Sequence, residues 1–416
     1  MTNSSTQDNR PHLVVLGSGF GALQCIRTLK SADFRVTVIS PRNHFLFTPL
    51  LIGTTVGTVE DRNITEPVRT RRSGSEFCQA TCEEIDADTK QLHCRSPLDD
   101  SFFTMGYDQL VIAVGGQNST FGIKGVREHA FFLKEVTDAR AIRRRILGCL
   151  ERASLPETSE QTRNQILHWV VVGGGPTGTE FAGELFDFLE DARDAYPKVA
   201  PQVNITLLEA AEDILPSFDQ ALRDYAVKRF QREGIEVRSE SPAKEVLEDR
   251  VILESGEEIP CGLVVWSTGI VPRPLVEKCD LPKTEKGFLR TDDCCRVVGH
   301  DDIYAIGDTA RTEERSYPAT AQLAQQQGRY LGKALTRSAR GKEINPFRFH
   351  NLGTLAYIGS RRALADLPVG KVKGRTAWLF WRSVYLTKLV GLRNKLNLLG
   401  DWIDTRIFGR DISRFP

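Results

Sequence analysis

Apolar segments that run directly into glycines and then into a helical pattern occur twice in this chain. The first is LVVLGSGFGALQCIRTL at residues 13–29, and the second is WVVVGGGPTGTEFAGEL at residues 169–185. Short aliphatic runs predict buried strands of a parallel sheet, and glycines between strand and helix predict a tight connecting turn. Each segment is therefore predicted to be a strand–turn–helix unit.

The pattern around these two segments predicts further elements in the same alternating order. After the first unit we expect a strand at 35–39, strands within 85–114 that end in LVIAVGG, and a helix at 135–150. After the second we expect strands at 205–208, 251–253, 263–269 and 302–308, and helices at 219–233 and 320–335. The polar stretch 151–165 is predicted to be a linker. A repeat on this scale predicts two related α/β domains.

The glycine spacing identifies what the two turns are built to hold. Gly173, Gly175 and Gly178 form a complete G-x-G-x-x-G pattern; Gly17 and Gly19 form the first, with Gly21 between and Ala22 in third place. Such glycines allow the tight turn, the approach of the backbone to a pyrophosphate, and close packing of helix on strand. The helix N-terminus then favours the phosphates. The sequence thus predicts two Rossmann-like dinucleotide sites.

The ends of the next strands distinguish the two sites. The segment ITLLEA ends on Glu209, and a carboxylate there accepts hydrogen bonds from a ribose 2′-hydroxyl and repels a 2′-phosphate. This favours NADH over NADPH, although a solvated charge at a strand end is the alternative. In the first unit Ser40 stands where an acid is usual. One site for FAD and one for NADH would explain the difference.

Composition narrows the class of protein. A chain of 416 residues is long enough for two or three domains, and its net charge of +1 gives no bulk attraction to nucleic acid. Nine cysteines without a C-x-x-C pair predict reduced, mostly buried thiols. The polar N-terminal stretch MTNSSTQDNRPH has no signal or transit character, and no apolar run is long enough to span a bilayer.

With these motifs in hand, the chain resembles the two-dinucleotide-binding flavoprotein disulfide reductases, and more specifically the type II NADH:quinone oxidoreductases. The motifs that carry the resemblance are SPRNHFLFTPLL (40–51), GGGPTGTEFAGEL (173–185), WSTG (266–269), YAIGD (304–308), TAQLAQQQG (320–328) and a tail with WRSVYLTKL and FGRDISRF. The resemblance implies an FAD domain at 1–120 and 288–345, an inserted NADH domain at 121–287, and a membrane-association region at 346–416.

The resemblance also implies roles for single residues. Besides Gly17, Gly19, Gly21 and Ser40, the residues expected at FAD are Arg42, Pro49, Gly115, Asp308 and Gln322. Those expected at NADH are Gly173, Gly175, Gly178, Glu180, Glu209 and Gly269. The alternative for Asp308 is a helix N-cap, and for Pro49 a turn proline.

The electron acceptor is inferred from what surrounds the flavin motifs. The segment SPRNHFLFTPLL lacks the cysteine pair of disulfide reductases, and the seven scattered histidines form no metal-binding pattern. The resemblance implies that Gln322 and Gln326 meet a quinone head group, and that Glu180 orients nicotinamide or relays a proton. Amides can donate to a quinone carbonyl while staying uncharged. The alternatives are polar surface for the glutamines and a favourable charge in the first helical turn for Glu180.

The C-terminal tail combines positive charge with an apolar stripe. Residues 375–416 carry eight Lys or Arg and three Asp, a balance of 8 − 3 = +5, together with Trp378, Trp381 and Trp402. The stripe consists of Leu392, Leu396, Leu399, Ile403 and Ile407. A basic amphipathic helix with tryptophans is typical of a membrane-surface anchor. An ordinary core-facing helix or a homodimer contact is the alternative.

The sequence therefore predicts a membrane-surface flavoenzyme that passes electrons from NADH through FAD to a membrane quinone without proton pumping. A soluble ferredoxin- or rubredoxin-type reductase and a redox protein of the apoptosis-inducing-factor type are the alternatives. The expected location is the cytoplasmic face of a bacterial inner membrane, or the mitochondrial inner membrane if the source is eukaryotic.

Overall fold

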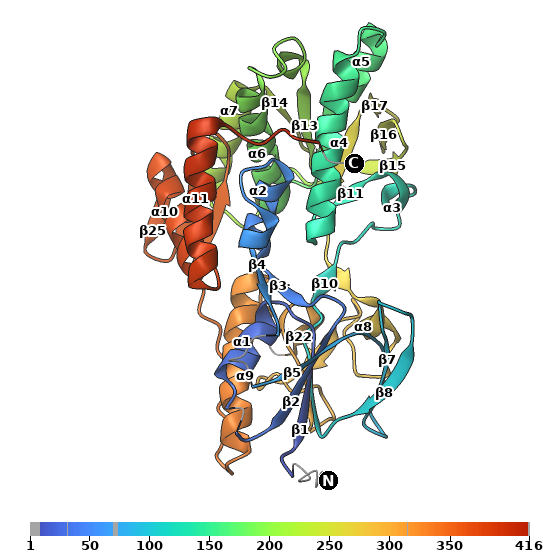
Figure 1. Ribbon diagram of the computed structural model, residues 1–416, viewed down its shortest axis with the longest axis vertical. Coiled ribbons are helices and arrows are strands. Elements are labelled where there is room, and N and C mark those ends of the chain that lie inside the picture. Colours follow the sequence, from blue (N-terminus) through green and yellow to red (C-terminus); the bar gives the residue numbers. More distant parts are fainter. Residues whose placement is uncertain (1–8, 31, 70–73, 314, 415–416) are drawn as a thin grey trace, which may run out of the picture. The chain divides into compact units, whose positions relative to one another are not determined.

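The computed structural model describes residues 9–30, 32–69, 74–313 and 315–414, so most of the N-terminal stretch read for targeting signals lies outside the described residues. The chain forms two compact units (Figure 1). The first unit takes residues up to 46, then 66–117 and 270–351. The second takes residues 47–65, 118–269 and 352–416.

The first unit is built on a five-stranded parallel sheet with the strand order β21-β9-β1-β2-β5. Its helices and strands are β1 (His12–Leu16), α1 (Phe20–Thr28), β2 (Arg35–Ser40), β3 (His44–Leu46), β5 (Glu76–Gln79), β6 (Thr81–Asp86), β7 (Gln91–Arg95), β8 (Phe102–Gly106), β9 (Gln109–Ile112), β10 (Gly116–Gln117), β19 (Val271–Pro272), α8 (Pro274–Lys278), β20 (Leu289–Thr291), β21 (Ile303–Ala305), β22 (Ala310–Thr312) and α9 (Ala321–Ser338). The short strand β4 (Thr65–Pro67) lies where the chain passes from one unit to the other.

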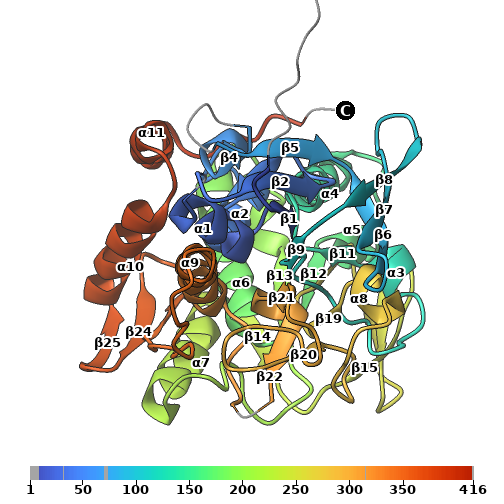
Figure 2. The ribbon, with the colours of Figure 1, turned by 90° about the horizontal axis from the view of Figure 1, so that it is seen from below.

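Strand β1 shows why this sheet is buried on both faces. Leu13 and Val15 pack with α1 and α9, whereas Val14 and Leu16 face the cluster formed with β6–β8 and α8. An unbroken aliphatic strand is what a parallel sheet covered on both faces requires. Helices α1 and α9 lie side by side (Figure 2). This close packing requires glycine at position 328, since a Cβ there would stand 2.1 Å from the carbonyl oxygen of Gly21.

The second unit repeats this design around a parallel sheet with the strand order β11-β18-β12-β13-β14. Its elements before the C-terminal region are α2 (Leu51–Thr55), α3 (Val126–His129), β11 (Phe131–Phe132), α4 (Val136–Ser154), α5 (Glu160–Ile166), β12 (His168–Val172), α6 (Pro176–Ala192), β13 (Asn204–Leu208), α7 (Gln220–Glu233), β14 (Ile235–Arg238), β15 (Ala243–Val246), β16 (Arg250–Leu253), β17 (Glu258–Pro260) and β18 (Leu263–Trp266). In both sheets the strand order reverses at the strand that precedes the glycine loop.

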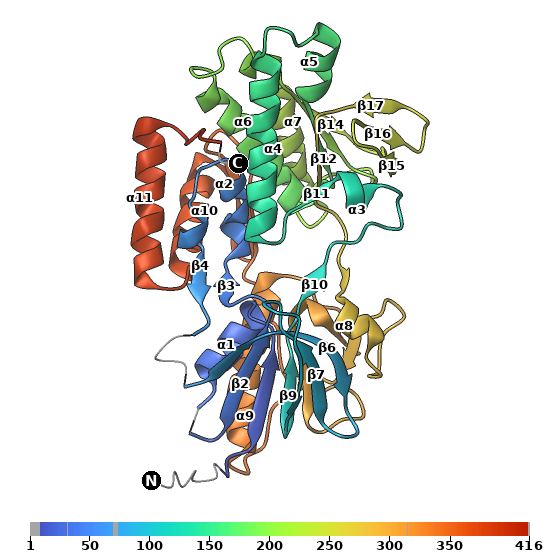
Figure 3. The ribbon, with the colours of Figure 1, turned by 45° about the vertical axis from the view of Figure 1, so that its right-hand side comes forward.

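The C-terminal region belongs to the second unit. It begins with an antiparallel sheet of β23 (Thr354–Tyr357), β24 (Ala363–Leu367) and β25 (Gly370–Gly374), followed by α10 (Arg375–Lys388) and α11 (Leu392–Phe408). The two helices run beside each other next to α2, and the tail then crosses from α11 to α4 (Figures 1 and 3).

The α/β fold class and the paired Rossmann-like sheets are confirmed, as are the helices at α4, α6, α7 and α9. The linker predicted at 151–165 is wrong. Helix α4 continues to Ser154 and α5 covers Glu160–Ile166, both within the second unit. A solvent-exposed helix carries the same polar residues as a linker, so polarity alone misled the prediction.

The compact units do not coincide with the predicted domain boundaries. Residues 47–65, expected in the FAD domain, lie in the second unit, where α2 packs against α4 and α6. The C-terminal region also packs there instead of standing apart. Compactness does not by itself assign a ligand, so the assignment of FAD and NADH to domains stays a prediction.

Candidate functional site

The first glycine loop lies where the strand order of the first sheet reverses. Gly17 follows β1 with a φ of +110°, and a Cβ there would stand 2.3 Å from the carbonyl oxygen of Ala113, just after β9. A Cβ on Gly19, the N-cap of α1, would meet nothing within 4 Å. Ligands of such sheets bind at the carboxyl ends of the strands at this switch point. The loop therefore leaves open space where a pyrophosphate would lie.

The end of β2 forms a hydroxyl cluster beside this loop. Ser40 donates to the hydroxyl of buried Ser18 at 3.1 Å, and Ser18 donates to the carbonyl of His44. Arg42 Nε donates to the same carbonyl at 3.0 Å. Sequence reasoning missed Ser18 and His44, although Ser18 lies inside the glycine motif. The cluster fixes Arg42 at the carboxyl edge of the sheet, and its role at a flavin stays a prediction.

The ends of β9 and β21 are tied together at the same edge. Gly115 N donates to Thr309 Oγ1 at 2.9 Å, which joins the VIAVGG and YAIGD motifs. The buried side chain of Gln327 accepts from Gly307 N at 2.7 Å, next to Asp308. Asp308 lies in a short 3₁₀ helix and makes no N-cap bond there. Gln327 was missed, although it stands inside the quoted glutamine motif.

The glutamine helix is α9, whose N-cap is Thr320. Gln326 makes two bonds to the backbone of His350: its Nε2 donates to the carbonyl at 2.8 Å, and its Oε1 accepts from the N–H at 3.0 Å. The amide nitrogen can still donate one further hydrogen bond, and the amide oxygen can still accept one. Gln326 therefore anchors the His350 segment, a role that the sequence did not suggest. Gln322 is half-buried on the same helix.

The second glycine loop repeats the first. Gly173 has a φ of +110°, and its Cβ would stand 2.8 Å from Thr268, after β18. A Cβ on Gly178 would stand 2.0 Å from the carbonyl oxygen of Gly173, whereas one on Gly175 would meet nothing within 4 Å. The three glycines thus have the turn, approach and packing geometry expected of them.

Glu209 lies against this loop, immediately after β13. Its Oε2 accepts from Gly174 N at 2.6 Å, and its Oε1 accepts from Ala211 N at 2.9 Å. These bonds hold the carboxylate beside the glycine turn, where a ribose would follow the pyrophosphate. Gly269 closes the loop after β18 with a φ of +73°, and its Cβ would clash with Ser119 and Phe121.

Glu180 is the fifth residue of α6, so it lies in the second turn and not in the first turn as predicted. The side chain is 7% exposed, and its Oε1 accepts from Tyr357 N at 3.0 Å. Burial raises the pKa of Glu180 to about 8. A carboxyl that holds a proton near neutral pH is suited to general acid–base chemistry.

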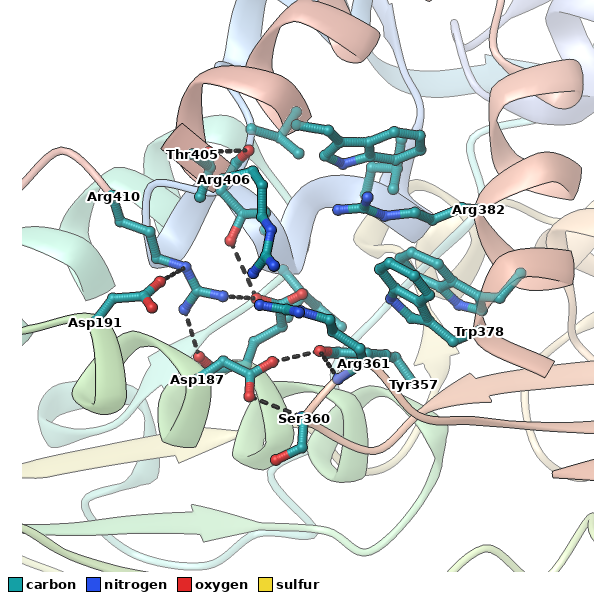
Figure 4. A pocket seen from close by; sticks show the side chains of 18 of the residues that line it. Asp187, Asp191, Tyr357, Ser360, Arg361, Trp378, Arg382, Thr405, Arg406 and Arg410 are labelled. Carbon is teal, nitrogen blue, oxygen red and sulfur yellow. Dashed lines mark hydrogen bonds and ion pairs between the residues drawn. The ribbon is translucent and has the colours of Figure 1, made fainter. Parts of the chain in front are cut away.

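Glu180 lines a large cavity of about 1060 Å³ inside the second unit, hereafter the large cavity. Its walls come from α2, α6, Tyr357, α10, α11 and the tail (Figure 4). Pro49 is also one of the residues that line it. Carboxylates along α6 and arginines from the segment after β23, from α10, from α11 and from the tail line the cavity together, and Arg410 lies directly beside Asp191 (Figure 4). The carboxylates are Glu180, Glu184, Asp187, Glu190 and Asp191, and the arginines are Arg361, Arg375, Arg382, Arg406 and Arg410.

Two arginines are held inside this cavity. Arg410, with only 6% of its side chain exposed, pairs with Glu184 Oε2 at 3.1 Å and Asp191 Oδ2 at 3.3 Å. Arg382 lies between the rings of Trp378 and Trp402, each 4.4 Å from its guanidinium carbon. Burial lowers the pKa of Arg382 and raises that of Glu184. On the same wall the Tyr357 hydroxyl donates to Asp187 (Figure 4).

These contacts correct the interpretation of the tail tryptophans. Trp381 and Trp402 are buried, because α10 and α11 turn them toward the large cavity, where Trp381 packs on Tyr357 and Tyr385. They are not surface anchors. Since Arg382 and Arg410 also point inward, the +5 balance overstates the charge available at the surface.

The apolar stripe of α11, by contrast, is exposed along its whole length. Leu392, Leu396, Leu399, Ile403 and Ile407 are between 39% and 74% exposed, and Phe408 is 81% exposed. The opposite face of α11 buries Asn394, Leu398 and Trp402. The core-facing alternative for the stripe is therefore wrong. Three stripe residues, Leu399, Ile403 and Ile407, also line the large cavity.

Three further features bear on the chemistry. All nine cysteines are free and seven are buried, which confirms the prediction of mostly buried thiols. Within the described ranges, no group of three or more His, Cys, Asp or Glu is placed to hold a metal ion. The same part of the chain contains no helix with the length and apolar character needed to cross a membrane.

Comparison with known proteins agrees with this arrangement. The family model "Pyridine nucleotide-disulphide oxidoreductase" matches residues 11–328, and "NDH2 C-terminal domain" matches residues 351–411. A protein named "Probable NADH dehydrogenase" from Dictyostelium discoideum is 45% identical over 410 residues, which cover 97% of this chain and 91% of the relative. "Internal alternative NAD(P)H-ubiquinone oxidoreductase A1, mitochondrial" from Arabidopsis thaliana is 40% identical, with 98% of this chain and 86% of the relative covered.

The solved structure of NDH2 from Plasmodium falciparum in complex with NADH superimposes with a TM-score of 0.94 at 27% identity, covering 97% of this chain and 100% of that chain. The agreement runs over nearly the whole chain and so includes the C-terminal helices. The chain therefore belongs to the type II NADH dehydrogenases (NDH2), within the pyridine nucleotide-disulphide oxidoreductase family.

Proposed function

We propose that this protein oxidises NADH and passes the electrons through FAD to a membrane quinone, from the surface of the membrane and without pumping protons. The observation that carries the proposal is the large cavity, which joins buried Glu180 to the exposed apolar stripe of α11. A lipid-soluble quinone needs an apolar entrance, and its reduction needs a proton donor in a site shielded from water. The names of the relatives, which act on ubiquinone, support this choice of acceptor.

The FAD site is proposed at the carboxyl edge of the first sheet. Open space above Gly19 and Gly115, where a Cβ would meet nothing within 4 Å, fits a dinucleotide lying across the strand ends. The residues that would hold it are Gly17, Gly19, Ser40, Arg42, Gly115, Asp308 and Gln322. Gly21 faces Ile306 and α9, so its contribution would be helix packing. FAD would supply the redox chemistry, and the chain supplies position and electrostatics.

The NADH site is proposed on the second glycine loop. Gly175 leaves space for the pyrophosphate at the N-terminus of α6, Gly173 and Gly178 shape the turn, and Glu209 would accept from the ribose hydroxyls. Glu180 and Gly269 complete the expected set. On the acceptor side, Gln322 and Gln326 would donate to the quinone carbonyls, and Glu180 would orient nicotinamide or relay a proton.

The membrane-bound alternative is favoured over a soluble ferredoxin- or rubredoxin-type reductase because residues 351–411 match the NDH2 C-terminal domain. The exposed stripe of α11 would lie on the bilayer, or form a homodimer contact, and the relative from Arabidopsis is named as mitochondrial. A peripheral position on an energy-coupling membrane is proposed.

The decisive experiment purifies the yellow protein and measures NADH oxidation with a short-chain quinone, with and without detergent. Oxidation that needed ferredoxin and ignored quinone would overturn the proposal.

Nucleotide choice is expected to depend on Glu209. Glu209→Gln should lower the ratio of NADH to NADPH kcat/KM about tenfold, since an unpaired charge beside a 2′-phosphate costs about 1 to 3 kcal/mol. Stopped-flow reduction of the flavin by each nucleotide measures the ratio. Glu212→Gln, an equal charge change at an exposed residue three positions away, is the matched control. An unchanged ratio in Glu209→Gln would show that Glu209 does not determine the choice between NADH and NADPH.

The glutamines of α9 are expected to separate the two half-reactions. Gln322→Leu should slow reoxidation of the flavin by quinone at least tenfold while leaving its reduction by NADH nearly intact. Gln326→Leu should do the same and also lower the free energy of unfolding by about 1 to 2 kcal/mol, because the His350 backbone loses both partners. Gln325→Leu is the control on the same helix. If both half-reactions fell together, α9 would serve the flavin site alone.

Membrane binding is expected to depend on the outer part of the stripe. Leu392, Leu396 and Phe408 are exposed and do not line the large cavity, so replacing all three with Ser leaves the cavity walls intact. This variant should bind anionic liposomes at least tenfold more weakly at every salt concentration, because apolar burial is not screened. Arg393→Glu with Lys395→Glu should weaken binding mainly at low salt.

Co-sedimentation with liposomes across a salt series measures both effects. Leu98→Ser with Val369→Ser, two exposed apolar residues elsewhere, is the control. A triple Ser variant that still pelleted with liposomes, but changed from dimer to monomer, would make the stripe a subunit contact.

A further inference from the structure

A second cavity in the second unit is lined by four arginines. It has a volume of about 300 Å³ and lies along α4, with the end of the tail forming part of its wall. The arginines are Arg144, Arg145 and Arg152 of α4 and Arg414 of the tail; no aspartate or glutamate lines the cavity. We call it the arginine cavity.

The neighbouring arginines of α4 show that this absence of counter-charge is local. Arg140 pairs with Asp61 at 2.6 Å, and Arg143 pairs with Asp411 at 2.9 Å. Across the described part of the chain, none of the four cavity arginines forms an ion pair within 4.0 Å. Four like charges gathered at one hollow repel one another, and an anion bound between them would relieve that repulsion.

Two contacts place these side chains at the cavity. Arg145 Nε donates to the carbonyl of Gly262 at 2.6 Å, which fixes the guanidinium and leaves its outer N–H groups for another acceptor. A Cβ on Gly148 would stand 3.8 Å from Arg414 Nε, so the tail arginine lies over the glycine of α4. Cys149 lies at the wall, where burial raises its pKa and the nearby charges of Arg145 and Arg152 lower it. The wall therefore presents positive charge to a partly enclosed space.

We propose that the arginine cavity binds a small phosphate-bearing anion. Guanidinium groups match the geometry of phosphate oxygens with paired, charge-assisted hydrogen bonds, which is why arginine clusters select phosphate. The cavity has room for a phosphate or pyrophosphate group, and it lies apart from both glycine loops in the sequence.

The tail connects this cavity to the large cavity within the second unit. Over five residues it places Arg410 against Glu184 and Asp191, Asp411 against Arg143, and Arg414 at the arginine cavity. An anion bound by Arg414 would restrict the tail, and Arg410 would then be held more firmly beside Glu184. Binding is therefore expected to change the KM for quinone, a consequence that rests on the proposed function, while the phosphate site itself does not.

The test uses the FAD-loaded enzyme with saturating NAD⁺, so that the dinucleotide sites do not take up the probe. Pyrophosphate is titrated by calorimetry at constant ionic strength. Arg144→Glu with Arg152→Glu should weaken its binding at least tenfold. Arg127→Glu with Lys228→Glu makes the same charge change at exposed residues of α3 and α7 and should leave binding unchanged. No saturable binding by the native enzyme, or equal affinity in both variants, would overturn the proposal.

Further measurements identify the phosphate source and protect the test from misfolding. The milder pair Arg144→Gln with Arg152→Gln should weaken binding in the same direction, with unchanged circular dichroism and flavin content. Vesicle binding that is equal in the two Glu variants assigns the site to a soluble phosphate compound. The site is assigned to a lipid head group if Arg144→Glu with Arg152→Glu loses binding to phosphatidic acid vesicles while the control variant keeps it. Pyrophosphate should then also compete with these vesicles for the native enzyme.

Kinetics then test the connection to the large cavity. Pyrophosphate should change the KM for quinone at least threefold in the native enzyme and leave it unaltered in the Arg144→Glu, Arg152→Glu variant. Pyrophosphate binding in a protein that failed to reduce quinone would contradict the proposed function and leave the phosphate site standing.

Discussion

Gly178→Ala is expected to lower the kcat/KM for NADH by at least a hundredfold. The added Cβ would stand 2.0 Å from the carbonyl oxygen of Gly173 and 2.6 Å from Ser267 Oγ, so the helix must move away from the glycine turn. A displacement of about 1 Å at a cofactor site costs about a hundredfold in rate, and overpacking costs about 1 to 3 kcal/mol of stability. Flavin reduction by NADH and urea unfolding measure the two effects.

Gly175→Ala is the matched control for this substitution. Its φ of −69° suits alanine, and its Cβ would meet no heavy atom within 4 Å. The Gly175→Ala variant should therefore unfold at the same urea concentration as the native enzyme. Only its affinity for NADH should fall, because the added methyl group occupies the space proposed for the pyrophosphate. If Gly178→Ala were as stable and as active as the native enzyme, the second loop would not be the NADH site.

Glu180→Gln is expected to remove one large contribution to the dependence of stability on pH. The native carboxyl holds its proton up to a pKa of about 8, whereas the unfolded chain releases it above the usual 4.5. Between these values the unfolded state binds fewer protons, so the free energy of unfolding falls as pH rises. At 1.36 kcal/mol per unit, the change amounts to about 5 kcal/mol.

Glutamine has no proton to release and can still accept from Tyr357 N. The variant should therefore gain stability relative to the native enzyme as pH rises from 5 to 8. Urea unfolding at several pH values measures this difference. Glu190→Gln, on the same helix with a side chain 39% exposed, should give a curve parallel to that of the native enzyme. A Glu180→Gln curve parallel to the native curve would place the buried proton elsewhere.

The glycine loops could be predicted because their information is local. Gly173, Gly175 and Gly178 lie within six residues; a positive φ requires the first, a close approach to the carbonyl oxygen of Gly173 requires the third, and the second leaves open space beside the turn. The buried strands could also be predicted, since a short unbroken aliphatic run fits few structures other than a buried parallel strand. The family tail motif likewise gave the C-terminal helices.

The environment of Glu180 could not be predicted, because its partners come from distant segments. Tyr357 is 177 residues away, and its backbone bond to Glu180 appears only after the C-terminal region packs on α6. The tryptophans show the same limit. An amphipathic pattern identified two faces on α11 but not which of them turns toward a protein wall, so Trp402 was assigned to the wrong surface.

The route of the chain through the two units has a consequence for synthesis on the ribosome. The backbone passes between the units at five points, so neither unit is encoded by one uninterrupted stretch. The first cannot be completed before residues 270–351 are made, and the second still lacks α10, α11 and Arg410 at that stage. Cotranslational folding must therefore leave both units unfinished until late in translation, and a premature stop codon near residue 400 would leave Glu184 without its arginine.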